Sequence, residues 1–151
     1  MSIITLEIAI PLDQDGFLEM ECDFCKNRFM LKKEVYENEE NISFFCPLCG
    51  FPNYTNTFFC PEVLEKAQQK AVNYMYDEID RTLGKTIRNI NKNGFIKMTL
   101  KKTHKEHERE LYIPFDNYEK VHKKCCGIDV KVKAFDKEIG TYCPICGGSE
   151  L

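Results

Sequence analysis

Cysteine is the residue type that gives this 151-residue chain its most distinctive chemistry, since the chain contains nine of them. Eight fall into short groups, which are Cys22 with Cys25, Cys46 with Cys49, Cys125 with Cys126, and Cys143 with Cys146. Only Cys60 stands apart. In a reducing compartment, thiols clustered in this way are more often metal ligands than disulfide partners. We therefore expect the grouped cysteines to bind metal.

Two of the pairs share the longer pattern Cys-Pro-x-Cys-Gly, at 46–50 and 143–147. Proline fixes φ in a tight turn that directs backbone N–H groups at the thiolate sulfurs, and the glycine accepts the positive φ that closes the turn. Two paired turns of this kind supply four sulfurs in a tetrahedron, which suits Zn²⁺ with Zn–S distances of about 2.3 Å. The pattern therefore predicts zinc as the metal.

The first two pairs have the spacing Cys22-x2-Cys25-x20-Cys46-x2-Cys49, which is typical of a four-cysteine zinc site. With Pro47 and Gly50, these residues resemble the zinc-ribbon family over roughly 17–52. The segments at 28–31 and 42–45 are expected to be short strands joined by a polar turn at 37–41. Four thiolates leave no open position on the metal, so this site is expected to be structural.

The second half repeats this plan less regularly. Residues 128–134 alternate like a strand, 136–138 form a turn, and 139–142 lead into Cys143 and Cys146. Cys125 and Cys126 are expected to complete a second zinc site, for a total of two Zn²⁺ per chain. His122 with Cys125, or His122 with Cys126, is an alternative ligand pair.

The other chemical motifs are weak. Cys-Pro-x-Cys also occurs in redox proteins at the start of a helix, but 50–53 and 147–149 are helix-stopping sequences here. His104 and His107 lie in a highly charged stretch and are expected to form a solvated turn. Cys60 has no neighbouring histidine and is expected to lie in the core or at a helix start. The sequence therefore predicts no catalytic residue, no other cofactor and no enzyme activity.

Apolar residues recur every three or four positions along one segment, at Leu64, Ala67, Ala71, Met75, Ile79, Leu83, Ile87 and Ile90. Pro61 suits the first helical position, and the sequence at 91–94 ends the pattern. The stripe is expected to pack in a core or, alternatively, to bind a partner. Alternating apolar residues also predict an N-terminal strand at 4–10 and a β-hairpin from 95–100 to 110–115.

The expected fold is therefore small α+β, with two zinc ribbons flanking a long central helix and a β-hairpin. The boundaries are 1–59 for the N-terminal strand and first ribbon, 60–93 for the helix, 94–116 for the hairpin and 117–151 for the second ribbon. With the opening at 10–17, this arrangement resembles small, uncharacterised bacterial double-zinc-ribbon proteins. Each ribbon is too short for a core of its own, so metal is expected to hold both ends while the middle supplies apolar packing.

The net charge of −3 conceals two oppositely charged regions. Residues 1–80 carry 15 acidic and 6 basic side chains, and residues 81–137 carry 7 acidic and 15 basic ones. We expect a non-enzymatic zinc-binding module or accessory subunit of a bacterial complex, with a protein partner or self-association. The alternative is a nucleic-acid-binding protein that uses the basic face of 81–133. The N-terminus resembles no secretory signal, so a cytoplasmic location is expected, with no membrane or small-molecule partner.

Overall fold

The computed structural model describes residues 3–102, 104–113 and 117–150. The chain divides into two compact units. One consists of Ala9–Val63 and Leu111–Leu151 and contains every cysteine, and we call it the cysteine unit. The other consists of Met1–Ile8 and Leu64–Glu110, and we call it the helical arm. Within the described residues, no helix has the length and apolar character that crossing a membrane requires.

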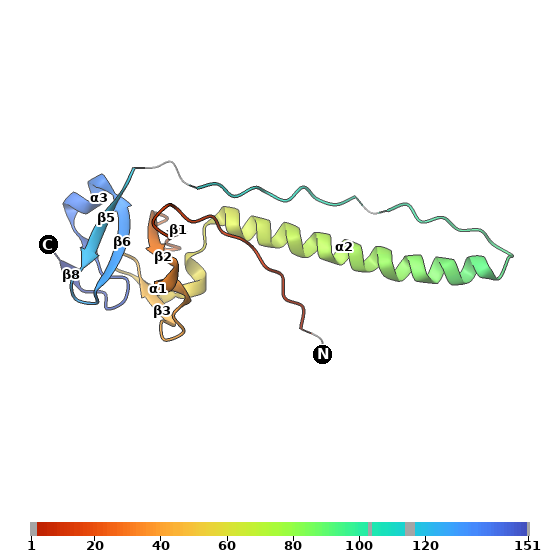
Figure 1. The fold of residues 1–151 in the computed structure, drawn as a ribbon, viewed down its shortest axis with the longest axis horizontal. Coiled ribbons are helices and arrows are strands. Elements are labelled where there is room, and N and C mark those ends of the chain that lie inside the picture. Colours follow the sequence, from red (N-terminus) through yellow and green to blue (C-terminus); the bar gives the residue numbers. More distant parts are fainter. Residues whose placement is uncertain (1–2, 103, 114–116, 151) are drawn as a thin grey trace. The chain divides into compact units, whose positions relative to one another are not determined.

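The cysteine unit is built on one antiparallel sheet to which both halves of the chain contribute (Figure 1). Its strands are β1 (Phe17–Glu21), β2 (Arg28–Lys32), β5 (Tyr118–Lys123) and β6 (Ile128–Lys133), in the order β1-β2-β6-β5. Strands β2 and β6 meet where Leu31 lies opposite Val130. The two cysteine-rich segments are therefore not independent ends of the molecule, because they share a sheet.

After its sheet hairpin, each half continues with a short helix and a second, smaller hairpin. In the first half these are α1 (Lys33–Glu37), β3 (Ser43–Phe45) and β4 (Pro52–Tyr54), followed by a 3₁₀ turn, η1 (Thr55–Phe58). In the second half they are α3 (Ala134–Ile139), β7 (Thr141–Tyr142) and β8 (Ser149–Glu150). The strands predicted near 28–31, 42–45 and 128–134 are confirmed. The turns predicted at 37–41 and 136–138 are wrong in part, because α1 ends at Glu37 and α3 contains 136–138.

The two halves also exchange reciprocal backbone hydrogen bonds through their Cys-Pro-x-Cys-Gly turns. The Phe45 N–H donates to the Pro144 carbonyl and the Tyr142 N–H donates to the Pro47 carbonyl, each at 2.8 Å. The repeated order of elements and these mirrored bonds indicate an approximate twofold relation between the halves.

Each half also places an aromatic ring against a glycine of the other half. A Cβ atom added to Gly147 would lie 2.8 Å from the ring of Phe45, and one added to Gly50 would lie 3.2 Å from the ring of Tyr142. Both glycines also have positive φ, 71° and 73°. Glycine is therefore required at these positions both for the turn and for the approach of the opposite half's aromatic ring.

The hydrophobic core lies between these halves. Its largest members include Met20, Phe29 and Phe44 from the first half and Val130 and Val132 from the second. Phe58, from η1, is fully buried and makes an edge contact with Phe29, with ring centroids 5.8 Å apart. The expectation of two metal-held ends around a helical apolar middle is therefore wrong, because the two cysteine-rich halves supply the core to each other.

The sequence predicted the long helix at 60–93, within one residue of its observed limits. Helix α2 (Pro61–Lys92) has proline at its first position and Glu62 in its first turn, where an acidic side chain interacts favourably with the helix dipole. Most of its apolar stripe is exposed, as shown by Met75 (56%) and Ile79 (48%). The stripe therefore does not pack in a core formed by the described residues.

The segment after α2 returns along the helix without forming a strand (Figure 1). The β-hairpin predicted within 94–116 is thus wrong for the described residues 94–102 and 104–113, while 114–116 lie outside them. Side chains of the helix satisfy the segment's backbone instead. The side chain of Asn73 accepts a hydrogen bond from the Glu106 N–H at 2.8 Å and donates one to the Glu106 carbonyl at 2.9 Å. The side chain of Asn91 makes the same pair of bonds with Met98. The N-terminal strand predicted at 4–10 is also absent, because residues 3–10 have no regular structure.

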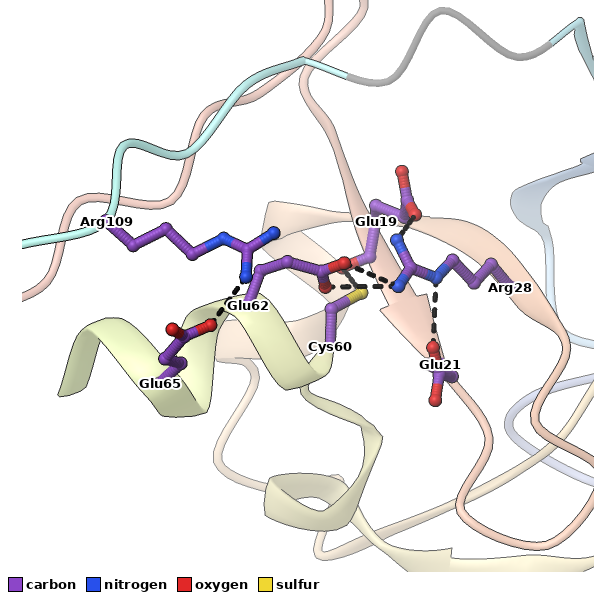
Figure 2. A network of polar contacts seen from close by, with 7 residues as sticks. All are labelled: Glu19, Glu21, Arg28, Cys60, Glu62, Glu65 and Arg109. Carbon is purple, nitrogen blue, oxygen red and sulfur yellow. Dashed lines mark hydrogen bonds and ion pairs between the residues drawn. The ribbon is translucent and has the colours of Figure 1, made fainter. Parts of the chain in front are cut away.

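Within the cysteine unit, a charged cluster joins Glu62, at the start of α2, to the sheet. Figure 2 shows the guanidinium of Arg28 between Glu19, Glu21 and Glu62, with N···O distances of 2.9, 2.9 and 2.8 Å. Only 32% of the Arg28 side chain is exposed, and the carboxylate of Glu62 is the largest of the influences that raise its pKa. Within the arm, the same figure shows Arg109 paired with Glu65.

Substituting Arg28 should be costly, because three carboxylates would lose their shared counter-charge. We expect Arg28→Ala to lower the free energy of unfolding by roughly 2–4 kcal/mol in denaturant titrations. Lys33→Ala is the matched control, since Lys33 forms an exposed pair with Glu37 at 3.5 Å and should cost about 0.5 kcal/mol or less. Equal losses in the two variants would contradict a structural role for the cluster.

The ring contact at Gly147 gives a second prediction. Gly147→Ala should lower the free energy of unfolding by about 1–3 kcal/mol more than Gly127→Ala does, because the new methyl group meets Phe45. Gly127 also has positive φ and also follows a cysteine, but a Cβ atom there meets nothing within 4 Å. Similar losses of unfolding free energy in the two variants would show that the Phe45 ring moves aside without a measurable loss of stability.

Candidate metal centres

The first group of cysteines brings together sulfur atoms from two turns of the first half. Cys22 and Cys25 lie in the turn between β1 and β2, and Cys46 and Cys49 lie in the turn between β3 and β4. All four Sγ atoms are within 4.8 Å of one another. Two of the distances are 3.7 Å (Cys22 to Cys49) and 3.8 Å (Cys25 to Cys46).

These distances identify the kind of bonding that the group can support. A disulfide has an S–S distance of about 2.05 Å, so the sulfurs are too far apart to be bonded to each other. Four sulfurs placed about 2.3 Å from a central ion at tetrahedral corners are about 3.8 Å apart. The group therefore has the dimensions of a tetrahedral metal site, and its residues fit Zn²⁺.

Backbone N–H groups surround the first group, as the Cys-Pro-x-Cys-Gly pattern predicts. The Leu48 N–H donates to the Sγ of Cys46 at 3.4 Å. Burial opposes ionisation of Cys22, but N–H groups of Cys25 and Phe24 outweigh it and lower the pKa of that thiol. Cys46 is more deeply enclosed, and its burial raises the pKa of its thiol. Backbone donors of this kind stabilise a thiolate that a metal would bind.

The second group combines sulfurs from the equivalent turns of the second half. Cys125 and Cys126 lie between β5 and β6, and Cys143 and Cys146 lie between β7 and β8. Their Sγ atoms are also within 4.8 Å of one another, and Cys125 and Cys146 are 3.5 Å apart. The Gly148 N–H donates to Cys146 at 3.4 Å and is the main cause that lowers the pKa of this thiol to about 7.

Hydrogen bonding in the two sheet hairpins explains the adjacent cysteines of the second group. In the first hairpin the Lys26 N–H donates to the Cys22 carbonyl, and in the second the Gly127 N–H donates to the Lys123 carbonyl. The donors have similar positive φ values, 60° and 65°. Lys123 thus occupies the place of Cys22, Cys126 that of Cys25, and Cys125 stands where the first half has Phe24.

Lys123 is therefore the largest departure from symmetry between the groups. Its side chain is 1% exposed, and its ammonium donates to the Thr141 carbonyl at 2.7 Å. A buried ammonium must have such a partner, because burying a charge without one is costly. The sequence motifs alone did not indicate this residue. The sequence feature that could have indicated Lys123 is the difference between Cys-x2-Cys in the first half and Lys-x-Cys-Cys in the second.

The structure does not bring His122 to the second group. Its Nδ1 atom lies 2.7 Å from the Oδ1 atom of Asp129, on the neighbouring strand β6. The four cysteines Cys125, Cys126, Cys143 and Cys146 form a group without it. The alternative ligand pairs that contain His122 thus receive no support from the geometry.

Cys60 lies outside both groups, immediately before α2. It is 5% exposed, and its thiol lies 3.6 Å from the Glu19 carbonyl. Burial raises its pKa to about 12, which keeps the thiol protonated and unreactive at neutral pH. The expectation of a core or helix-start position for Cys60 is confirmed.

The two groups differ in their access to solvent. Cys22 and Cys46 are buried in the first group, whereas only Cys143 is buried in the second, in which Cys125 and Cys146 are exposed. In each group, four thiolates would complete a tetrahedral coordination sphere and leave no position for a substrate. The arrangement is therefore suited to holding structure together.

Comparisons of this chain with protein-family models, with curated proteins and with solved structures found no match. What the chain shows by itself is a small α+β structure with antiparallel strands, one long helix and two groups of four cysteines that can hold metal ions.

Proposed function

We propose that this chain is a non-enzymatic interaction module of the zinc-ribbon type that binds two structural Zn²⁺ ions and uses its helical arm to contact a protein partner. The observation that carries the proposal is the pair of four-cysteine groups, with sulfur–sulfur distances of 3.5–3.8 Å. Zinc is proposed as the metal because it favours four thiolates in a tetrahedron and needs no redox partner. Iron bound by four thiolates is the competing assignment.

Metal binding would complement the small core. The buried apolar residues come from short strands, and structural zinc contributes an apparent ~10–16 kcal/mol in peptide systems. That is comparable to the whole stability of a domain. We therefore assign the metal a structural role, and we assign the exposed apolar stripe of α2 to recognition.

Nucleic acid is the second candidate partner, because residues 81–105 contain eight Lys and Arg and no Asp or Glu. Fewer basic side chains within 81–133 are available to bind phosphate than the sequence suggested, because Lys123 is buried and Lys131 is paired with Asp13 and Asp15. A protein partner is favoured, because phosphate binding gives no role to the exposed apolar residues of the stripe. The candidate cellular location remains the cytoplasm, where thiolate sites stay reduced.

Metal analysis tests the proposal directly. Freshly purified, reduced protein should contain about two Zn per chain, and Cys46→Ser should lose about one of them together with much of its stability. Cys60→Ser is the matched control and should keep both ions, since Cys60 belongs to neither group. His122→Ala should also keep both. Iron in place of zinc, or a single ion in the unmodified chain, would contradict the proposal.

The difference in solvent exposure between the two cysteine groups predicts which group loses its metal first. A competing chelator should remove zinc first from the group of Cys125, Cys126, Cys143 and Cys146, because two of its sulfurs are open to solvent. A chromogenic reporter should record two phases with rates at least about tenfold apart, and Cys143→Ser should abolish only the fast one. Loss of the slow phase in that variant would reverse the assignment.

A further inference from the structure

The apolar stripe of α2 runs along most of the helical arm and is open to solvent among the described residues. Its five exposed members, with exposed fractions of 37–56%, are Leu64, Met75, Ile79, Leu83 and Ile90. From Leu64 to Ile90 it extends about 39 Å at 1.5 Å per residue. A shallow depression lined by Glu78, Ile79, Thr82 and Leu83 lies near its middle. Such a long exposed stripe on one helix is typical of a surface that another helix covers.

Among the described residues of the returning segment, the hydrogen bonds of 105–109 do not lie on this stripe. The segment contacts a different face of the helix, where Glu65, Gln69, Asn73 and Asp77 are spaced four residues apart and bind residues 105–109. That face is displaced from the stripe by roughly 110° around the helix axis. The apolar stripe therefore stays available for a partner.

Charge divides the arm into two opposite ends. Residues 64–80 and 106–110, the base of the arm, carry seven acidic and three basic side chains. Residues 81–105, the tip, carry eight basic side chains and no acidic one. Six of the basic residues of the tip have no ion pair with any described residue: Lys85, Arg88, Lys92, Lys97, Lys101 and Lys102.

We infer that the occupant of the stripe is the arm of a second copy of this chain, packed in the antiparallel direction. Antiparallel pairing about Ile79 sets Met75 of each copy level with Leu83 of the other. It also sets Lys85 of each tip level with Asn73 of the other copy, beside which Glu106 and Glu108 lie, so opposite charges attract there. Parallel pairing would place the two basic tips together.

A second copy accounts for two independent features, the exposed stripe and the segregated charge. A nucleic acid would neutralise the tip but leave Met75 and Ile79 in water, whereas an unrelated apolar helix would give no role to the eight bases. The inference rests on the proposed function, because it names the partner of the same module. It does not depend on which metal fills the cysteine groups.

The test is the mass of the metal-loaded full chain in sedimentation velocity from about 1 to 100 µM, at low and at moderate salt. We expect a dimer that loosens as salt rises. Ile79→Glu with Leu83→Glu should be monomeric over this range, because four carboxylates would be buried in the dimer. Phe135→Glu with Ile139→Glu is the matched control on α3, whose side chains are 74% and 60% exposed, and it should remain dimeric.

Charge reversal then distinguishes the direction of packing. Lys85→Glu, which reverses two charges in the dimer, should weaken the antiparallel dimer by roughly tenfold or more at low salt, whereas it would strengthen a parallel one by relieving repulsion. Metal content and helix content measured on each variant separate a failure of the module from a failure of pairing. A metal-loaded wild type that stays monomeric, a control pair that dissociates equally, or a tighter charge-reversed dimer would overturn the inference. So would a monomer that binds a mixed-sequence oligonucleotide through Lys85 and Arg88.

Discussion

The pairing of β2 with β6 is the contact on which the rest of the cysteine unit depends. Each half offers only short strands, and neither could enclose a core alone. When Leu31 and Val130 meet at the centre of the sheet, Phe29 and Phe44 from one half and Val132 from the other are buried together. The same approach carries Phe45 onto Gly147 and Tyr142 onto Gly50. The two candidate metal centres thus lie at the edges of one common core.

The approximate twofold relation also explains why the groups differ. A second half that copied the first would have a cysteine at position 123. Lysine stands there instead, and its ammonium is buried against the Thr141 carbonyl. Cys125 supplies the remaining sulfur from a position nearer the tip of the turn, so the second group is more exposed. Two differences in a repeated framework, Lys123 at the place of Cys22 and Cys125 at the place of Phe24, therefore accompany one enclosed and one accessible group. That difference follows from where a sulfur can enter the turn.

The sequence pattern of the helical arm predicts its helix correctly but not the conformation of the returning segment. The 3.6-residue period of α2 and its proline start are local, so its limits were predicted within a residue. The alternation at 95–100 and 110–115 equally suggested strands, but a strand exists only where another strand accepts its hydrogen bonds. Here Asn91 bonds the backbone of Met98 within the first stretch, and Asn73 bonds the backbone of Glu106 between the two stretches. The short helices α1 and α3 were missed for a related reason, since a single turn of helix has almost no periodic signal.

Residue type and spacing along short stretches were enough to predict the first group of four cysteines, the helix and the segregation of charge, but they left His122 as an alternative ligand in the second group. Tertiary structure decided that the two cysteine-rich halves share one sheet and core, that Cys125 and Cys126 rather than His122 join the second group, that Lys123 occupies the place of Cys22, and that the stripe of α2 is exposed. The shared sheet depends on contacts between residues about 100 positions apart, such as Met30 with Lys131. No periodicity encodes such a contact, because it arises only when both surfaces are formed and complementary.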